Sequence, residues 1–119
     1  MRYVDGFVLP VRKSKLQAYA RISRKAGKVW REHGALEYIE CSGDDLKVKM
    51  GKSFRRTVKA KPNETVVFSW IVYKSRAHRD RVIAKVMKDP RLSSMMDPKS
   101  MPFDMKRMVY GGFKGFVDV

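Results

Sequence analysis

Two carboxylates stand inside otherwise apolar stretches of this 119-residue sequence, and they are its first candidates for chemistry. Asp5 lies in the run YVDGFVL and Glu40 in the run LEYIEC. A carboxylate removed from water is costly unless it is paired, and desolvation raises its pKa. We therefore expect a pocket between a sheet and its helices in which Asp5 or Glu40 handles a proton as a general acid or base.

Other polar and aromatic residues in similar runs are candidates for holding a ligand in that pocket. They are Tyr3, Ser69, Trp70, Arg107 and Tyr110. A tyrosine hydroxyl can bind a polar group of a small organic molecule, and such a site would suit an isomerase or a cofactor-free oxygenase. The structural alternative is that Asp5 forms an ion pair with a basic residue, for which Arg107 on a neighbouring strand is the candidate.

The usual residues of metal and thiol chemistry give no comparable pattern. His33 and His78 lie 45 positions apart, and neither stands in a short ligand motif, so we predict no metal site. His33 is interpreted as a residue at a helix end, where the helix dipole favours positive charge. The single cysteine, Cys41, has no activating base nearby in sequence and is interpreted as a small buried hydrophobe.

The glycines and methionines near the end of the chain can each be interpreted as structural residues or as part of a ligand site. Gly111 and Gly112 lack the lysine and hydroxyl of a phosphate loop, so we predict no nucleotide or other cofactor and expect a bulge or a close backbone approach. A methionine-rich segment fills gaps or forms an adaptable lid over the pocket. Its residues are Met95, Met96, Met101, Met105 and Met108, with Pro98 and Pro102.

Six elements are predicted to position these residues. Strands are expected over residues 3–10, 36–41, 65–73 and 107–117, and helices over 14–33 and 75–88. Pro10 should close the first strand, and Ser75 should cap the second helix. In residues 46–63 the pattern fits either a short helix or an irregular edge strand through Phe54, Val58 and Ala60. Residues 92–105 are expected to form an irregular connection.

The order of these elements predicts one domain over residues 1–119. Strand, helix, strand, strand, helix, strand is the α+β, ferredoxin-like βαββαβ order. It gives a four-stranded antiparallel sheet with both helices on one face. The predicted strands are apolar on both faces, as in VVFSWIVY over residues 66–73, so the face without helices needs cover. We expect a homodimer, sheet against sheet; the alternative is that residues 46–63 and 92–105 cover this face within one chain.

Composition limits the partners. Lys and Arg number 27 against 12 Asp and Glu, a net charge of +15, which attracts polyanions. The cations are spread over several segments, so a charged outer surface without a dedicated partner is favoured over the alternative, a basic module that binds nucleic acid or another polyanion. No apolar run is long enough to cross a membrane, and a single cysteine fits a reducing compartment, so we expect a cytoplasmic protein.

Several short motifs resemble those of the YbaA-like family of uncharacterised bacterial proteins. They are YVDGF at 3–7, GAL at 34–36, EC at 40–41, VVFSWI at 66–71, DPR at 89–91, MPFD at 101–104, KRM at 106–108 and YGGF at 110–113. The matches run in order along nearly the whole chain. The resemblance implies a dimeric α+β barrel, a superfamily that also includes small cofactor-free monooxygenases, muconolactone isomerase-like enzymes and haem-degrading relatives. It implies a reaction only by analogy.

Overall fold

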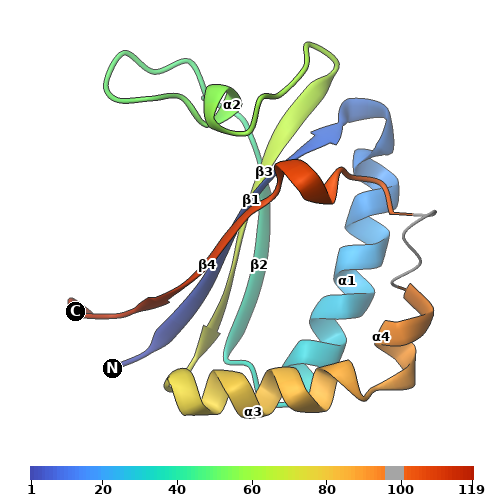
Figure 1. Ribbon diagram of the computed structural model, residues 1–119, viewed down its shortest axis with the longest axis vertical. Coiled ribbons are helices and arrows are strands. Elements are labelled where there is room, and N and C mark those ends of the chain that lie inside the picture. Colours follow the sequence, from blue (N-terminus) through green and yellow to red (C-terminus); the bar gives the residue numbers. More distant parts are fainter. Residues whose placement is uncertain (96–100) are drawn as a thin grey trace.

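Four strands form one antiparallel sheet in the order β2-β3-β1-β4 in the computed structural model, which describes residues 1–95 and 101–119 (Figure 1). The strands are β1 (Tyr3–Arg12), β2 (Glu37–Ser42), β3 (Glu64–Tyr73) and β4 (Val109–Lys114). The helices are α1 (Leu16–Glu32), α2 (Phe54–Thr57), α3 (Arg76–Met87) and α4 (Pro90–Met95), with the short 3-10 turns η1 (Lys13–Lys15) and η2 (Met105–Arg107). The strand order and the succession of the main elements are the ferredoxin-like arrangement that the sequence predicted.

β1 runs through the middle of the sheet, between β3 and β4. The prediction that this strand ends at Pro10 is wrong, because the strand continues to Arg12. β4 pairs with β1 only as far as Val8, and beyond it a single bridge joins Val11 to Phe103. Pro10 therefore lies where β1 is largely open on that side, and such an edge tolerates a residue without an N–H.

α1 lies along one face of the sheet, which we call the helix face, and α3 crosses the end of the strands and extends to the same side (Figure 1). Ser75 caps α3 as predicted, because its hydroxyl accepts a hydrogen bond from the His78 N–H at 3.1 Å. Gly34 follows the end of α1 with a φ of +119°, a conformation that favours glycine. Helix α4 was not predicted from the sequence. It begins at Pro90, whose fixed φ suits the first position of a helix.

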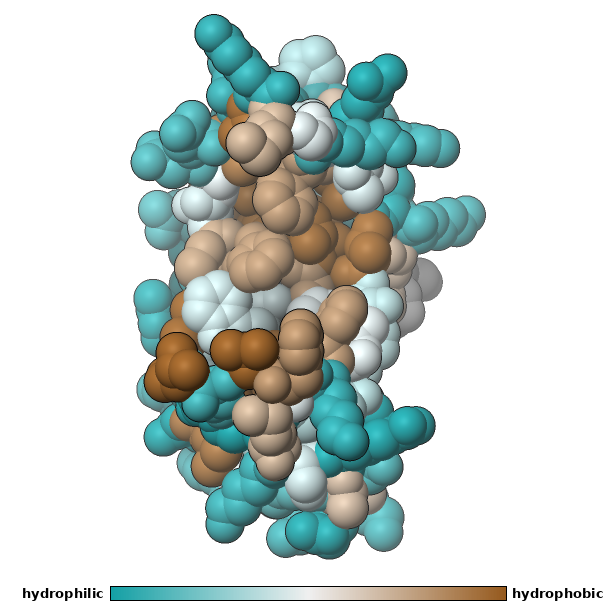
Figure 2. Space-filling view, turned by 90° about the vertical axis from the view of Figure 1, so that its left-hand side faces the viewer, coloured by the Kyte–Doolittle hydropathy of each residue, from teal (hydrophilic) through white to brown (hydrophobic). Residues whose placement is uncertain are grey.

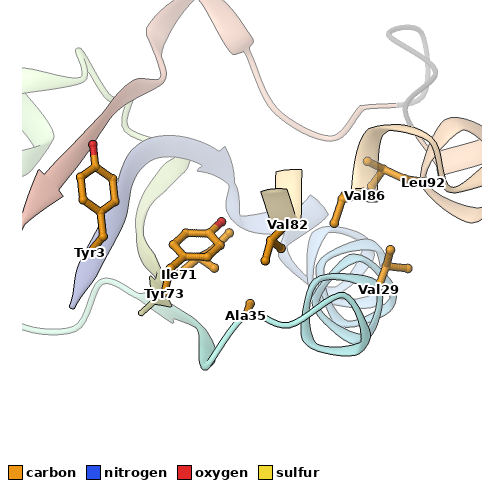
Figure 3. Close-up of a cluster of buried hydrophobic side chains, with 8 residues drawn as sticks. All are labelled: Tyr3, Val29, Ala35, Ile71, Tyr73, Val82, Val86 and Leu92. Carbon is orange, nitrogen blue, oxygen red and sulfur yellow. The ribbon is translucent and has the colours of Figure 1, made fainter. Parts of the chain in front are cut away.

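Most of the hydrophobic core lies between the helix face and the helices. Val29 of α1, Val82 and Val86 of α3 and Leu92 of α4 converge beside Tyr73 of β3 (Figure 3). Each of these side chains is at most 4% exposed. The core therefore fixes α1, α3 and α4 against the sheet. Met87, the last residue of α3, is 52% exposed.

The opposite face of the sheet, the open face, carries exposed apolar side chains. Strand alternation and register place on it Ile39, Phe68, Trp70, Val109 and Phe113. Phe68 is 43% exposed, and Phe113 is 64% exposed. Figure 2 shows apolar side chains gathered along the middle of this face, with hydrophilic ones around them. The prediction that the sheet is apolar on both faces is confirmed.

Residues 46–63 leave most of the open face uncovered. The segment contains the four-residue α2 and lies beside one end of the sheet on the open-face side (Figure 1). The Phe54 ring packs edge-on against the Phe68 ring, with 5.9 Å between the ring centroids. Both residues are nevertheless more than 40% exposed. Among the described residues, no helix combines the length and the apolar composition needed to cross a membrane.

Candidate functional site

A cavity of about 410 Å³ lies between the helix face and the helices, and we call it the inner cavity. Most of its lining is apolar, and α1, α3, α4 and the sheet all contribute to it. Its polar lining residues are Asp5, Tyr19, Ser23, Tyr38, Glu40, Ser69, Tyr73 and Tyr110. An apolar cavity with a few converging polar groups is the usual form of a small-molecule site.

Strand register explains why residues from distant parts of the chain meet here. Phe7 of β1 lies opposite both Ser69 of β3 and Tyr110 of β4, and Glu40 of β2 also lies opposite Ser69. Residues that face one another across paired strands point to the same side of the sheet. The structure thus brings five residues predicted for the site to the cavity lining: Asp5, Glu40, Ser69, Trp70 and Tyr110.

Asp5 is 1% exposed and is paired with Arg79 of α3. The Arg79 Nη1 donates to Asp5 Oδ1 at 3.2 Å and to the Tyr110 hydroxyl at 3.1 Å, while Nη2 donates to the Tyr3 hydroxyl at 3.3 Å. Burial raises the pKa of the Asp5 carboxyl, and the Arg79 charge only partly opposes this effect. The prediction that Asp5 pairs with a basic residue is confirmed, but the candidate Arg107 is wrong, because Arg79 of α3 supplies the cation.

Tyr3 belongs to this polar cluster but not to the cavity lining. The Arg79 guanidinium lies over the Tyr3 ring, with its Cζ carbon 4.9 Å from the ring centroid, and Tyr3 is 8% exposed. β4 passes directly over its hydroxyl, because a Cβ at Gly112 would stand 2.3 Å from that oxygen. β4 keeps a regular register there, so of the two readings of Gly111 and Gly112 the close backbone approach is confirmed.

Glu40 has a different environment, without a cation. The Tyr19 hydroxyl donates to one carboxylate oxygen, and the Tyr38 hydroxyl donates to the other at 3.2 Å. Ser23 of α1 lies 3.2 Å from the same Tyr38 oxygen. Among the described residues Glu40 forms no ion pair. Burial raises the pKa of Glu40, while the two hydrogen bonds lower it by less.

The two tyrosines beside Glu40 remain hydrogen-bond donors. Burial, followed by the negative charge of Glu40, raises the pKa of Tyr19 and that of Tyr38 above the ordinary range. Tyr19 and Ser23 stand four residues apart on one side of α1, and only the structure connects them with Glu40. In sequence the signal for this network is weak, because tyrosine on a buried helix side is ordinary core composition.

Arg107 was predicted to hold a ligand, and it does not line the inner cavity. Its guanidinium nitrogens donate to both carboxylate oxygens of Glu64 at 2.7 Å, and Nε donates to Asp104 at 3.0 Å. The Arg107 hydrogen bonds lower the pKa of Glu64 to about 2. The expected final strand starts at 109 rather than 107, so Arg107 lies in η2 and fastens that turn to the start of β3.

Trp70 and Cys41 point away from the helices. Trp70 touches the inner cavity, but strand alternation directs its ring to the open face, where it lies 5.6 Å from the Phe68 ring. Cys41 is exposed, so its interpretation as a buried hydrophobe is wrong. Its position on the edge strand β2 leaves that side chain without cover.

The methionine-rich segment contributes to the cavity lining through Met95, Met101, Met105 and Met108. Met96 and Pro98 lie outside the described residues. His33 caps the end of α1, as interpreted, and is 2.9 Å from an Asp89 carboxylate oxygen. Over residues 1–95 and 101–119, no three His, Cys, Asp or Glu side chains lie close enough together to hold a metal ion.

Comparison with known proteins supplies a family. The family described as "Protein of unknown function (DUF1428)" matches residues 2–105. The "Uncharacterized protein YbaA" of Escherichia coli strain K12 is 47% identical over 118 residues, which cover 99% of each chain. The protein of the same description from Shigella flexneri is similar to the same extent.

Solved structures share the fold at low sequence identity. An uncharacterised NIPSNAP domain protein from Burkholderia xenovorans is 12% identical with a TM-score of 0.56, covering 96% of this chain and 94% of its own. A putative antibiotic biosynthesis monooxygenase from Nitrosomonas europaea is 16% identical with a TM-score of 0.58, covering 97% of this chain and 99% of its own. At such identities the likeness establishes the fold and leaves the site to be argued from its own residues.

Proposed function

The chain belongs to the DUF1428 family of proteins of unknown function, and from this premise we propose that it is a cytoplasmic homodimer in which each subunit binds a small organic molecule in the inner cavity. The observation that carries the proposal is the cavity itself. It is apolar over most of its lining and presents two carboxyl groups, the buried Asp5 and the half-buried Glu40. The shared fold of the putative monooxygenase from Nitrosomonas europaea agrees with a small-molecule role.

The two carboxyl groups have separate roles in this proposal. β3 lies between their strands, which puts Asp5 and Glu40 on strands roughly 10 Å apart, too far to act on one atom. Asp5 is occupied by Arg79, an arrangement that orients α3 and the Tyr110 hydroxyl at the cavity. Glu40 lacks a cation and carries a raised pKa, so it is the group we propose to exchange a proton with the bound molecule.

The homodimer is proposed from the open face. Its exposed apolar side chains include Phe68 and Phe113, and a twofold partner with the same surface would cover them. Covering several hundred Å² of apolar surface would contribute on the order of 10 kcal/mol. The test is sedimentation equilibrium at micromolar concentration. A folded particle of 13.8 kDa would remove the homodimer from the proposal.

The test of the binding function uses a neutral aromatic probe and a variant that fills the cavity. Calorimetric titration with naphthalene carboxamide is expected to show one site per subunit. Ala26→Phe adds a ring inside the cavity lining and should abolish binding, whereas Ala84→Phe, at an exposed position on α3, should leave it intact. Equal binding by both variants would show that the probe lies elsewhere, and the inner cavity would lose its proposed role.

A further inference from the structure

A second hollow, which we call the outer groove, lies on the other side of the polar cluster around Glu40. It has a volume of about 700 Å³ and is lined by residues of α1 and of β2, the strand at the sheet edge. Arg24, Lys28 and Arg31 of α1 line it. The proposed function does not use this groove.

The cations of the outer groove share one side of α1. Their spacing of four and three residues places Arg24, Lys28 and Arg31 in a row along the helix, and we call this row the basic rim. Within the described residues, Arg24 and Lys28 form no ion pair, and Arg31 donates to the carbonyl oxygen of Leu36. A row of cations that face a hollow without carboxylate partners attracts anions.

The carboxylates that line the same groove do not neutralise the rim. Glu32 is 2.7 Å from an Arg91 nitrogen, so its charge is already matched by a cation outside the groove. Glu40 receives hydrogen bonds from Tyr19 and Tyr38. The outer groove is therefore positive along α1 and apolar where Leu16 and Val67 contribute to its lining.

The outer groove and the inner cavity have a common wall. Tyr19, Ser23, Tyr38 and Glu40 line both spaces. These side chains are linked to one another by hydrogen bonds and not by apolar packing alone. α1 comes closest to β2 at this wall, where a Cβ on Gly27 would stand 2.7 Å from the Tyr38 ring. A molecule that reached the inner cavity from this side would pass the basic rim first.

We propose that the molecule bound in the inner cavity is an organic anion, with an apolar body that lies inside the cavity and an acidic group that remains on the basic rim of the outer groove. This inference rests on the proposed binding function and names its ligand class. The recognised chemistry is a carboxylate, sulfonate or phosphate at one end of an aromatic or aliphatic body. The wall between the two spaces must open at the Tyr19 and Tyr38 hydrogen bonds for such a molecule to span it.

The experiment compares two probes that differ only in charge. Naphthalene carboxylate and the neutral naphthalene carboxamide have the same ring system and nearly the same size. Each is titrated calorimetrically into the parent, into the rim double variant Arg24→Gln/Lys28→Gln, and into the control Arg21→Gln/Lys25→Gln. The control residues are exposed positions on the same helix outside the groove lining, and the control removes the same net charge.

We expect the rim variant to weaken carboxylate binding about tenfold and the control variant to weaken it less than about twofold, because each solvent-facing ion pair contributes modestly. The carboxamide should bind both variants as it binds the parent. Carboxylate affinity should also fall as salt is raised from low to moderate concentration, while carboxamide affinity should not.

The outcomes separate this inference from the function on which it rests. Carboxamide binding that is lost in Ala26→Phe, together with carboxylate binding that ignores the rim variant, would retain the proposed function and overturn the anion inference. Failure of both probes to bind would overturn both. Displacement of the carboxylate by a short single-stranded DNA at low salt would assign the basic rim to a polyanion and overturn the inference of a small organic anion.

Discussion

The two faces of the same sheet depart from the usual pattern of burial in different ways: the helix face buries polar side chains, and the open face exposes apolar ones. On the helix face Ser69 is 5% exposed and Asp5 is 1% exposed, whereas on the open face Phe68 is 43% exposed although it is the sequence neighbour of Ser69. A protein usually buries apolar groups and exposes polar ones. Buried polar groups around a cavity indicate a site, and exposed apolar groups on a sheet indicate a missing partner. The buried polar groups of the helix face therefore indicate a binding site, and the exposed apolar groups of the open face indicate a contact with another chain.

The largest expected effect breaks the polar arrangement of the helix face. Arg79→Met keeps the apolar stem of the side chain but leaves Asp5 without its cation, and we expect it to lower the free energy of unfolding by about 3 kcal/mol. Urea denaturation measures the change, with Arg81→Met at an exposed position of the same helix as the control. Adding Asp5→Asn should restore part of the loss. Equal stability of the two single variants would mean that the ion pair does not hold α3 to the sheet.

The next effect breaks the open face. Phe68→Lys places a charge in the apolar patch, and we expect it to raise the dissociation constant of the proposed homodimer about a hundredfold. Sedimentation equilibrium measures it, and Ala84→Lys on α3 controls for the added charge. Because Phe68 points away from the inner cavity, carboxamide binding should persist in the variant. Loss of probe binding together with association would show that the two faces are not independent.

A third effect lies away from both faces, at the pair between Glu64 and Arg107. The pKa of Glu64 is lowered to about 2, so this group stabilises the fold above pH 4.5, and that contribution is lost as the pH falls toward 2. Arg107→Gln should remove about 2 kcal/mol at neutral pH and flatten the acid limb of the stability curve. Urea titrations from pH 2 to 7 measure it. A strong change in the affinity for the carboxamide in this variant would show that Arg107 does contribute to ligand binding in the inner cavity.

The smallest effect sharpens the contrast between the two carboxyl groups of the inner cavity, Asp5 and Glu40. The raised pKa of Glu40 means that the folded state binds a proton more tightly than the unfolded state, so its contribution to stability is greatest at low pH and falls as the pH rises above 4.5. Glu40→Gln keeps an acceptor for one of the two tyrosine hydroxyls, presents an N–H donor to the other, and lacks this titration. We expect it to be slightly more stable than the parent at pH 8, by less than about 1 kcal/mol, and equal to it near pH 4. A parent curve that rises over this range would contradict the assignment.

The sequence was sufficient for the fold because the strongest signals were local. The β-branched and aromatic run at 65–73 and the helical period at 14–33 leave few alternatives, and the strand order follows from the connections. Asp5 and Glu40 were recognisable because a carboxylate inside an apolar run is unusual. The partners of these carboxylates were not recognisable, because which side chains meet them depends on how the helices and strands pack together.

Arg79 and Arg107 show where sequence reasoning ended. Arg79 lies in the first turn of a helix rich in cations, where an arginine is expected to face water. Only the packing of α3 over the sheet directs it to Asp5. Arg107 was paired with Asp5 by an assumed start of the last strand, and the actual register sets Gly112 opposite Asp5. A shift of a few residues at a strand end changes which side chains meet.

The two tryptophans lie on opposite faces of the sheet, so the fluorescence of each reports on a different face. Trp30 lines the inner cavity and donates its indole N–H to the Tyr73 hydroxyl at 3.1 Å, while Trp70 stands on the open face. A molecule entering the cavity would perturb the emission of Trp30, and burial of the open face would shift that of Trp70 toward the blue. With Trp70→Phe and Trp30→Phe as the two single-fluorophore forms, occupancy and self-association can be followed in the same solution conditions without any added label.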